Sequence, residues 1–175
     1  MKRHYRLISL FVVILFAAAL PGCARGAEFR DYGPLYAVYI PDNWIYQAKE
    51  STPLLNVFYG AGEYDLLYFE LLENVCDRSA GDFGRRALQL YAAAGGLRQF
   101  ELLEPLSPVE VGGLDGVKCT YIYKDAAGTF LREERVFFIL PGRRGFSLAL
   151  AGPKAAVDSR LLQDIIRGWR WFLED

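Results

Sequence analysis

Two short stretches of this sequence are apolar on both alternating sets of positions, and they most restrict the fold. They are Leu66–Phe69 and Val136–Leu140. Successive side chains of a β-strand point to opposite faces of its sheet, so a strand with one wet face should alternate apolar and polar residues. These stretches therefore predict strands that are covered on both faces. We expect an α+β fold in which helices flank an antiparallel β-sheet on both faces, an α/β/α sandwich.

Two amphipathic segments can supply the covering helices. Ser79 is suited to cap a helix that runs to about Ala94, where Gly95 and Gly96 end it. A second helix is predicted from about residue 155 to residue 172, because its apolar residues recur at spacings of three and four. The predicted strands span residues 35–40, 55–59, 65–73, 117–124, 129–140 and 146–151, with a further extended segment after residue 100 that Pro105 and Pro108 interrupt.

The N-terminus has the pattern of an export signal. Lys2, Arg3 and Arg6 precede an apolar run over residues 7–20. That run is shorter than the ~20 apolar residues needed to cross a ~30 Å hydrocarbon core, and small residues follow it. We expect a signal peptide over residues 1–22. The alternatives are a plain signal peptide cleaved near Ala17–Ala19, and an uncleaved anchor, which the length of the run disfavours.

The residues Leu20-Pro21-Gly22-Cys23 resemble the lipobox of bacterial lipoproteins. The resemblance implies a diacylglyceryl group on the Cys23 sulfur, cleavage before Cys23, and an acyl chain such as palmitate on the new amine. Several acyl chains anchor a protein stably, so the membrane is an expected partner. We then expect a lipidated polar tether over residues 23–34 and a single domain over residues 35–175. Ala24 implies the periplasmic side of the outer membrane if the source is Gram-negative.

The composition excludes several classes of function. Without the 22-residue signal, 153 residues remain, with 17 basic and 21 acidic residues and a net charge of −4, which gives no indication of nucleic-acid binding. The single histidine, His4, lies in the signal. The exported chain therefore cannot use Ser-His-Asp or Cys-His catalysis or a histidine metal site. We expect no metal, no cofactor and no enzymatic activity.

Two cysteines remain besides Cys23. Cys76 and Cys119 form an even pair in an exported chain, so a disulfide between them is one reading. The other, which we favour, is that both are small buried apolar residues.

Three motifs resemble the PsbP-like superfamily, which includes the DcrB-type bacterial lipoproteins. They are Val38–Trp44, Gly113–Gly116 before an aromatic strand, and Ile165–Phe172. The resemblance implies an antiparallel sheet flanked by helices and mostly accessory or interaction roles. It supplies no shared catalytic residues.

Charged residues inside predicted strands are candidate functional residues. Glu133 and Glu134 lie between Arg132 and Arg135, but adjacent strand residues face opposite ways, so we expect solvated side chains and cross-strand ion pairs rather than paired carboxylates. Glu70, within an apolar strand, is either a buried acid or the partner of a basic group.

An interaction surface is predicted at Trp171, Arg143 and Arg144. Trp169 and Trp171 could not both face inward from one helix, and we assign the exposed position to Trp171.

The sequence thus predicts a non-catalytic, lipid-anchored cell-envelope protein that acts as an accessory module for an envelope protein partner. The alternative is a small-ligand-binding envelope lipoprotein with a pocket between the sheet and one helix. An enzyme that uses carboxylates alone would need two acids converging in a cleft.

Overall fold

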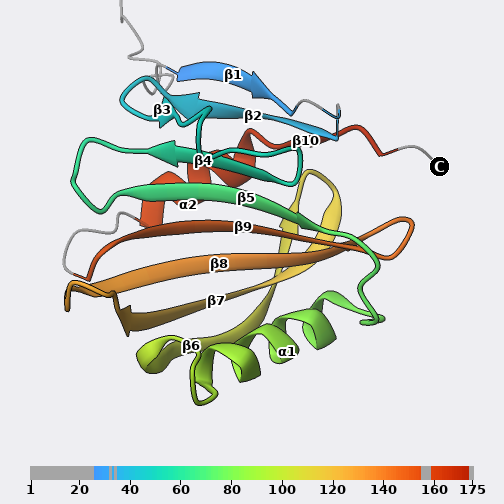
Figure 1. Ribbon diagram of the computed structural model, residues 1–175. Helices are drawn as coiled ribbons and strands as arrows, with labels where there is room; N and C mark the ends of the chain where they lie inside the picture. The colour runs from blue at the N-terminus through green and yellow to red at the C-terminus, as the bar shows by residue number, and fades with distance from the viewer. Residues whose placement is uncertain (1–25, 32, 34, 155–158, 174–175) are drawn as a thin grey trace, which may run out of the picture.

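The computed structural model describes residues 26–31, 33, 35–154 and 159–173 (Figure 1). The expected signal peptide over residues 1–22 and the lipobox Leu20–Cys23 lie outside the described residues.

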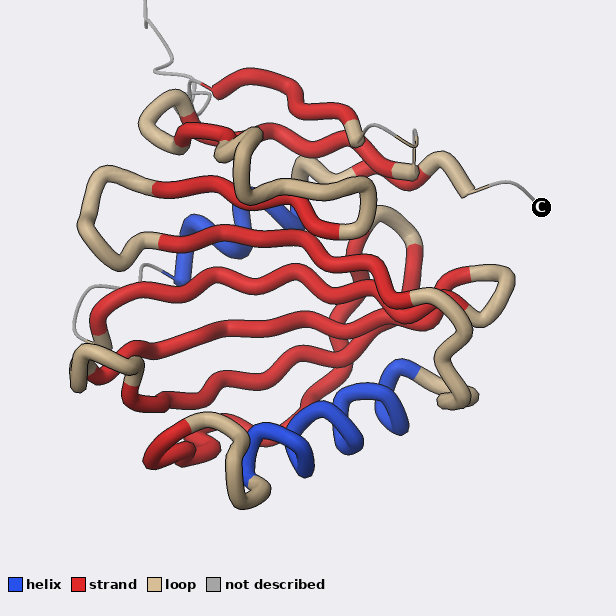
Figure 2. The backbone as a smooth tube through the Cα atoms, in the orientation of Figure 1, coloured by secondary structure: helices blue, strands red, loops and turns tan. Residues whose placement is uncertain are grey.

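Seven antiparallel strands form the main sheet, in the order β3-β4-β5-β9-β8-β7-β6 (Figures 1 and 2). Their bounds are β3 Ile45–Tyr46, β4 Leu55–Tyr59, β5 Leu66–Leu72, β6 Arg98–Val111, β7 Leu114–Lys124, β8 Phe130–Leu140 and β9 Arg144–Pro153. The mostly antiparallel sheet is as predicted. The expected break at Pro105 and Pro108 is wrong, because β6 continues through both prolines with register shifts relative to β7. An edge strand tolerates proline, since its outer backbone groups need no sheet partner.

A second, three-stranded sheet was not anticipated. It has the order β1-β2-β10 and consists of β1 Gly26–Arg30, β2 Tyr36–Pro41 and β10 Arg170–Trp171. The segment expected to be a tether therefore contains a strand, in which Gly26 pairs with Pro41 and Arg30 with Ala37. Backbone pairing can order a short polar segment that hydrophobicity alone marks as a tether.

The two helices are α1, Ala80–Ala92, and α2, Ser159–Arg167. Ser79 caps α1 as predicted, and its hydroxyl accepts a hydrogen bond from the Asp82 backbone N–H. The C-terminal helix ends at Arg167, five residues earlier than expected from the sequence, and the chain continues into β10. Within the described ranges, neither helix is long and apolar enough to cross a bilayer.

The two faces of the main sheet are covered differently. Phe138 belongs to a core with Tyr36, Leu162 and Trp169, so that face is closed by α2 together with the small sheet. Its neighbour Phe137 belongs to a second core with Phe83 of α1. The sheet is therefore not a plain sandwich between two helices. In Figure 1, α1 lies along the β6–β7 end, and the strands nearer β4 extend beyond it.

Candidate functional site

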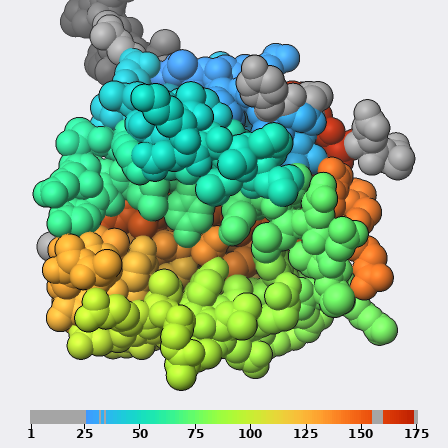
Figure 3. Space-filling model, in the orientation of Figure 1, coloured from blue at the N-terminus to red at the C-terminus, as the bar shows by residue number. Residues whose placement is uncertain are grey.

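A pocket of about 500 Å³ opens on the face of the sheet that carries α1. Figure 3 shows this face hollowed between the segment around β4 and the α1 region. The lining consists of three aliphatic residues (Leu55, Val57, Leu66), four tyrosines (Tyr59, Tyr68, Tyr91, Tyr123) and three charged residues (Glu50, Glu70, Arg135). β4, β5, β7 and β8 supply most of these side chains, and α1 supplies Tyr91.

An ion pair lies at the floor of this pocket. Glu133 and Arg135 are two residues apart on β8, so both point to the α1 face. They are 3% and 6% exposed, and 3.6 Å separates Arg135 Nη1 from Glu133 Oε1. Our expectation of solvated side chains is wrong for Glu133, Glu134 and Arg135, whereas an ion pair across the sheet does form, between Arg135 and Glu70. The predicted alternation holds, since Glu134 faces the other way and accepts a hydrogen bond from Arg132 Nη2 at 2.9 Å.

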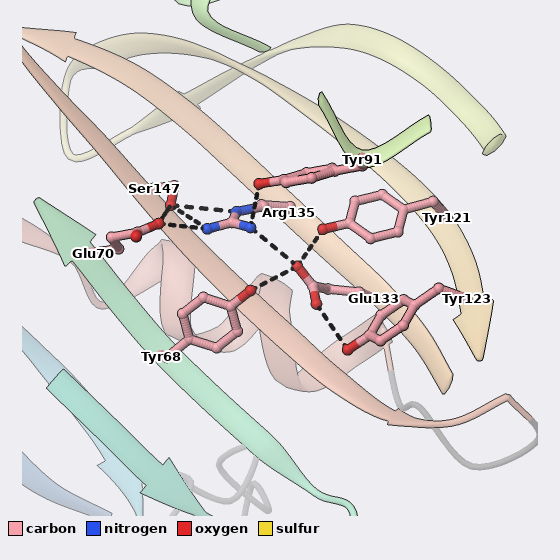
Figure 4. A network of polar contacts seen from close by, with 8 residues as sticks. All are labelled: Tyr68, Glu70, Tyr91, Tyr121, Tyr123, Glu133, Arg135 and Ser147. Carbon is pink, nitrogen blue, oxygen red and sulfur yellow. Dashed lines mark hydrogen bonds and ion pairs between the residues drawn. The ribbon is translucent and has the colours of Figure 1, made fainter. Parts of the chain in front are cut away.

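Arg135 is held by groups from three further elements (Figure 4). Its Nη2 donates to Glu70 Oε2 on β5 at 2.7 Å and to Ser147 Oγ on β9 at 2.9 Å. Its Nη1 donates to the Tyr91 hydroxyl on α1. Of the two readings of Glu70, the structure supports pairing with a basic group. The guanidinium is fixed in place because its donors are engaged on several sides.

Glu133 accepts hydrogen bonds from tyrosine hydroxyls on both sides (Figure 4). Tyr68 donates to Oε1 at 2.9 Å, Tyr121 donates to the same oxygen, and Tyr123 approaches Oε2 at 3.4 Å. Burial, and secondarily the Glu133 carboxylate, raise the pKa of Tyr68 and of Tyr121 well above the usual value. The hydroxyls therefore stay neutral donors, and the buried carboxylate is satisfied.

The lining of the pocket limits the chemistry that it offers. Arg135 and Glu70 are engaged with each other, and the described lining residues include no Ser, Thr, Cys or His. Among the described residues, no group of three or more Asp, Glu, Cys or His is placed to hold a metal ion.

The assignment of Trp171 to the exposed surface is wrong. The side chain is only partly exposed, packs against the main core, and donates from its indole Nε1 to the Val111 carbonyl at 2.8 Å. The reason is that α2 stops at Arg167, so Trp169 and Trp171 lie in a non-helical segment where alternate residues share a face. Arg143 and Arg144 lie at the β8–β9 turn, where Arg143 is exposed and Arg144 is half-buried, and neither lines the pocket.

The cysteines match neither reading completely. Both are free thiols; Cys119 is buried on β7 and Cys76 is exposed. The expectation of two buried residues is therefore right for Cys119 and wrong for Cys76. Cys23 lies outside the described residues.

The tyrosines of the site were not found from the sequence. Tyr121 and Tyr123 lie in the strand predicted over residues 117–124, but nothing in that prediction shows that they meet Glu133. The available signal was a pair of opposite charges at positions 133 and 135, on one face of a strand that is otherwise apolar. Such charges are buried when partners across the sheet satisfy them.

Comparison with solved structures finds the same fold in proteins of low sequence identity. CyanoP, the PsbP of Synechocystis, is 18% identical with a TM-score of 0.63, over 90% of this chain and 99% of that chain. Mog1p, a Ran-binding protein of Saccharomyces cerevisiae, is 13% identical with a TM-score of 0.63, over 86% and 97%. LpqN, involved in cell envelope biogenesis in Mycobacterium tuberculosis, is 12% identical with a TM-score of 0.56, over 83% and 90%.

No protein-family model matches the sequence, and a search of curated proteins finds no match. The structural likenesses show that this chain has a PsbP-like fold, as the sequence resemblance implied. Proteins as different as a Ran-binding protein and a protein involved in cell envelope biogenesis share this fold, so the fold does not specify a ligand.

Proposed function

We propose that this protein is a non-catalytic, lipid-anchored cell-envelope protein that acts as an accessory module through the pocket on its α1 face. The observation that carries the proposal is the pocket itself, a cavity of about 500 Å³ that is lined by Arg135 and Glu70 of the buried ion-pair network. Concave sites of this size with apolar walls and a few fixed polar groups are typical of small-ligand binding. The lipobox resemblance at Cys23 and the envelope-related neighbour LpqN support the location.

The first strand, β1, begins close to the proposed lipid anchor. Gly26 lies three residues after Cys23 and already pairs with Pro41. Three extended residues span about 10 Å, so acyl chains on Cys23 would hold the domain against the membrane surface, without a long tether. The turn after Pro41 leads to Ile45, which is 66% exposed, so an apolar side chain lies near the proposed anchor.

The anchor is tested by metabolic labelling with a palmitate analogue in cells that express the full chain. We expect label in the wild-type protein and in Cys76→Ser, and none in Cys23→Ser. Loss of membrane association should accompany loss of label. Label in Cys23→Ser would overturn the proposed anchor.

The accessory role is tested by affinity capture of the intact protein from native membranes, with bound proteins and small molecules identified by mass spectrometry. We expect a retained partner or small molecule that is lost when the pocket is blocked by Val57→Trp, and kept in the control Glu101→Gln on β6. If Val57→Trp retains the same partner or small molecule as the wild-type protein, a role for this pocket is contradicted.

A further inference from the structure

The pocket carries an excess of negative charge. Glu50 and Glu70 line it, and Glu133, which is buried and not part of the lining, pairs with Arg135. Arg135 is the one cation among the described lining residues, and its guanidinium already pairs with both Glu70 and Glu133. Two lining carboxylates against one guanidinium, which also pairs with the buried Glu133, leave the pocket net negative. A small cation would therefore be attracted into it.

The carboxylate of Glu70 is only half used. Its Oε2 accepts from Arg135 and Ser147, whereas no described residue donates a hydrogen bond to Oε1. The Glu70 side chain is 36% exposed and lines the pocket, so this oxygen is accessible to a ligand.

The donors of the pocket are directed to its own carboxylates. Tyr59 donates its hydroxyl proton to Glu50, and Tyr68 and Tyr123 donate theirs to Glu133. The Arg135 donors are taken by Glu70, Ser147 and Tyr91. An anionic ligand would face carboxylates and find few donors, so the pocket disfavours it.

The walls offer aromatic faces and apolar surface. Tyr59, Tyr68, Tyr91 and Tyr123 surround the cavity together with aliphatic side chains such as Val57. The face of a tyrosine ring attracts cations, most strongly where water is excluded, and aromatic walls of this kind bind quaternary ammonium groups. Arg135 already uses this interaction, since its guanidinium carbon lies 5.1 Å from the centre of the Tyr68 ring.

We propose that the pocket binds a small organic cation, an ammonium group with apolar substituents, between the tyrosine faces and the carboxylates of Glu70 and Glu50. This inference rests on the proposed function in one respect, that the pocket is a binding site. It adds the chemical class of the ligand.

The test uses three probes of nearly the same shape and different charge. They are choline, its neutral carbon isostere 3,3-dimethylbutan-1-ol, and the anion 3,3-dimethylbutanoate. Each is titrated into the full-length protein in a maltoside detergent, which has no ammonium group, and binding is followed by NMR. We expect choline to bind about tenfold more tightly than the neutral isostere and the anion to bind most weakly.

Two substitutions locate the effect. Glu70→Gln keeps the shape of the side chain and should weaken choline binding severalfold without changing the neutral isostere. Because Glu70→Gln also affects Arg135, the rim substitution Glu50→Gln serves as a second variant that spares the buried network. Glu101→Gln, on exposed β6, removes a carboxylate away from the pocket and should leave all three affinities unchanged.

The outcomes separate the ligand class from the site. If the neutral isostere or the anion binds as tightly as choline, and Tyr59→Leu abolishes that binding, the pocket is a binding site and the cation proposal is wrong. If none of the three probes binds, the cation proposal is also overturned, whereas the anchor and capture experiments still decide the proposed function independently. Choline binding that Glu70→Gln and Glu50→Gln both leave unchanged places the cation elsewhere and rejects this pocket.

Discussion

Trp169 and Trp171 lie against each other in one core, with their ring centroids 5.1 Å apart. Both also contact Tyr36, which stacks on Trp169 at 4.6 Å with an angle of 20° between the rings. This aromatic cluster joins the C-terminal segment to β2. The β6–β7 turn closes over it, because Trp171 donates to the Val111 carbonyl immediately before Gly112.

A substitution in that turn should show how tightly the tryptophans fill it. Gly112 has a φ of +58°, and a Cβ there would lie 3.0 Å from the Trp169 carbonyl oxygen and 3.1 Å from Trp171 Cδ1. Gly113 has a φ of +82° with nothing within 4 Å. We expect Gly113→Ala to cost about 1 kcal/mol from backbone conformation alone, and Gly112→Ala about 2–3 kcal/mol because crowding is added. Urea unfolding measures both, and equal costs would contradict the packing described.

Substitutions of Arg135 and Glu133 should have strongly non-additive effects on the free energy of unfolding. Arg135→Met leaves Glu133 buried beside neutral tyrosines, so we expect a loss of about 3–5 kcal/mol in the free energy of unfolding. Adding Glu133→Leu should cost less than the two single losses combined, since no uncompensated carboxylate then remains on the floor. Arg85→Met, which breaks the exposed pair of α1 with Asp82, is the control and should change the free energy of unfolding far less, because solvent screens exposed ion pairs. Additive losses in the double variant would show that the two residues do not interact.

Alkaline pH should unfold this protein through its buried tyrosines. Burial raises the pKa of Tyr36, Tyr68 and Tyr121 well above the usual value, so they stay protonated in the folded state. In the unfolded chain they ionise near pH ~10. Stability from these groups is therefore complete below pH ~10 and falls above it, by up to about 1.4 kcal/mol per pH unit for each tyrosine.

Chemical denaturation between pH 8 and 11 measures this slope. Tyr121→Phe removes one of the three buried tyrosines, so the free energy of unfolding should fall less steeply with pH, by about the contribution of one tyrosine. The explanation fails if spectrophotometric titration shows that all tyrosines ionise near pH 10 while the chain is still folded.

The cysteines should differ in reactivity. Burial, followed by the nearby Glu133 carboxylate, raises the pKa of Cys119 to about 12, so its thiol is protonated and shielded at pH 8. Cys76 is exposed. We expect one thiol to react with Ellman's reagent in the folded protein and two after denaturation, with the Cys23 sulfur blocked by lipid. Cys76→Ser should leave none in the folded state. A third reactive thiol in the denatured protein would argue against lipid on Cys23, and no reactive thiol would indicate a disulfide.

The position of the domain on the membrane can be tested with an environment-sensitive dye. We expect a dye on Ile45→Cys to shift to the blue when the anchored protein is placed in vesicles, because Ile45 lies near the start of β1. The matched control is Leu102→Cys on β6, an exposed position at the opposite edge of the main sheet, where the spectrum should not change. Both variants carry Cys76→Ser so that only one exposed thiol is labelled. Equal shifts at the two positions would contradict the proposed orientation.

Local patterns were sufficient for much of the sheet. The strands predicted over residues 55–59 and 65–73 agree closely with β4 and β5, because the residue preferences of a strand act over a few residues. Ser79 likewise determines where α1 begins, since its cap is formed with residue 82 of the same segment. The apolar positions on both faces of β8 correctly indicated that both faces are covered.

Only the tertiary structure determines the conformation of the segment around Trp171 and the set of residues that meet at the site. Extended pairing with β2 takes Trp171 out of the predicted helix, so the predicted surface residue is instead partly buried against the core. The site brings Tyr68 to Glu133 and Glu70 to Arg135, each pair 65 residues apart in the sequence. A charge pattern cannot show whether such groups are solvated or buried, because that depends on partners that only the order of strands in the folded sheet brings within hydrogen-bonding distance.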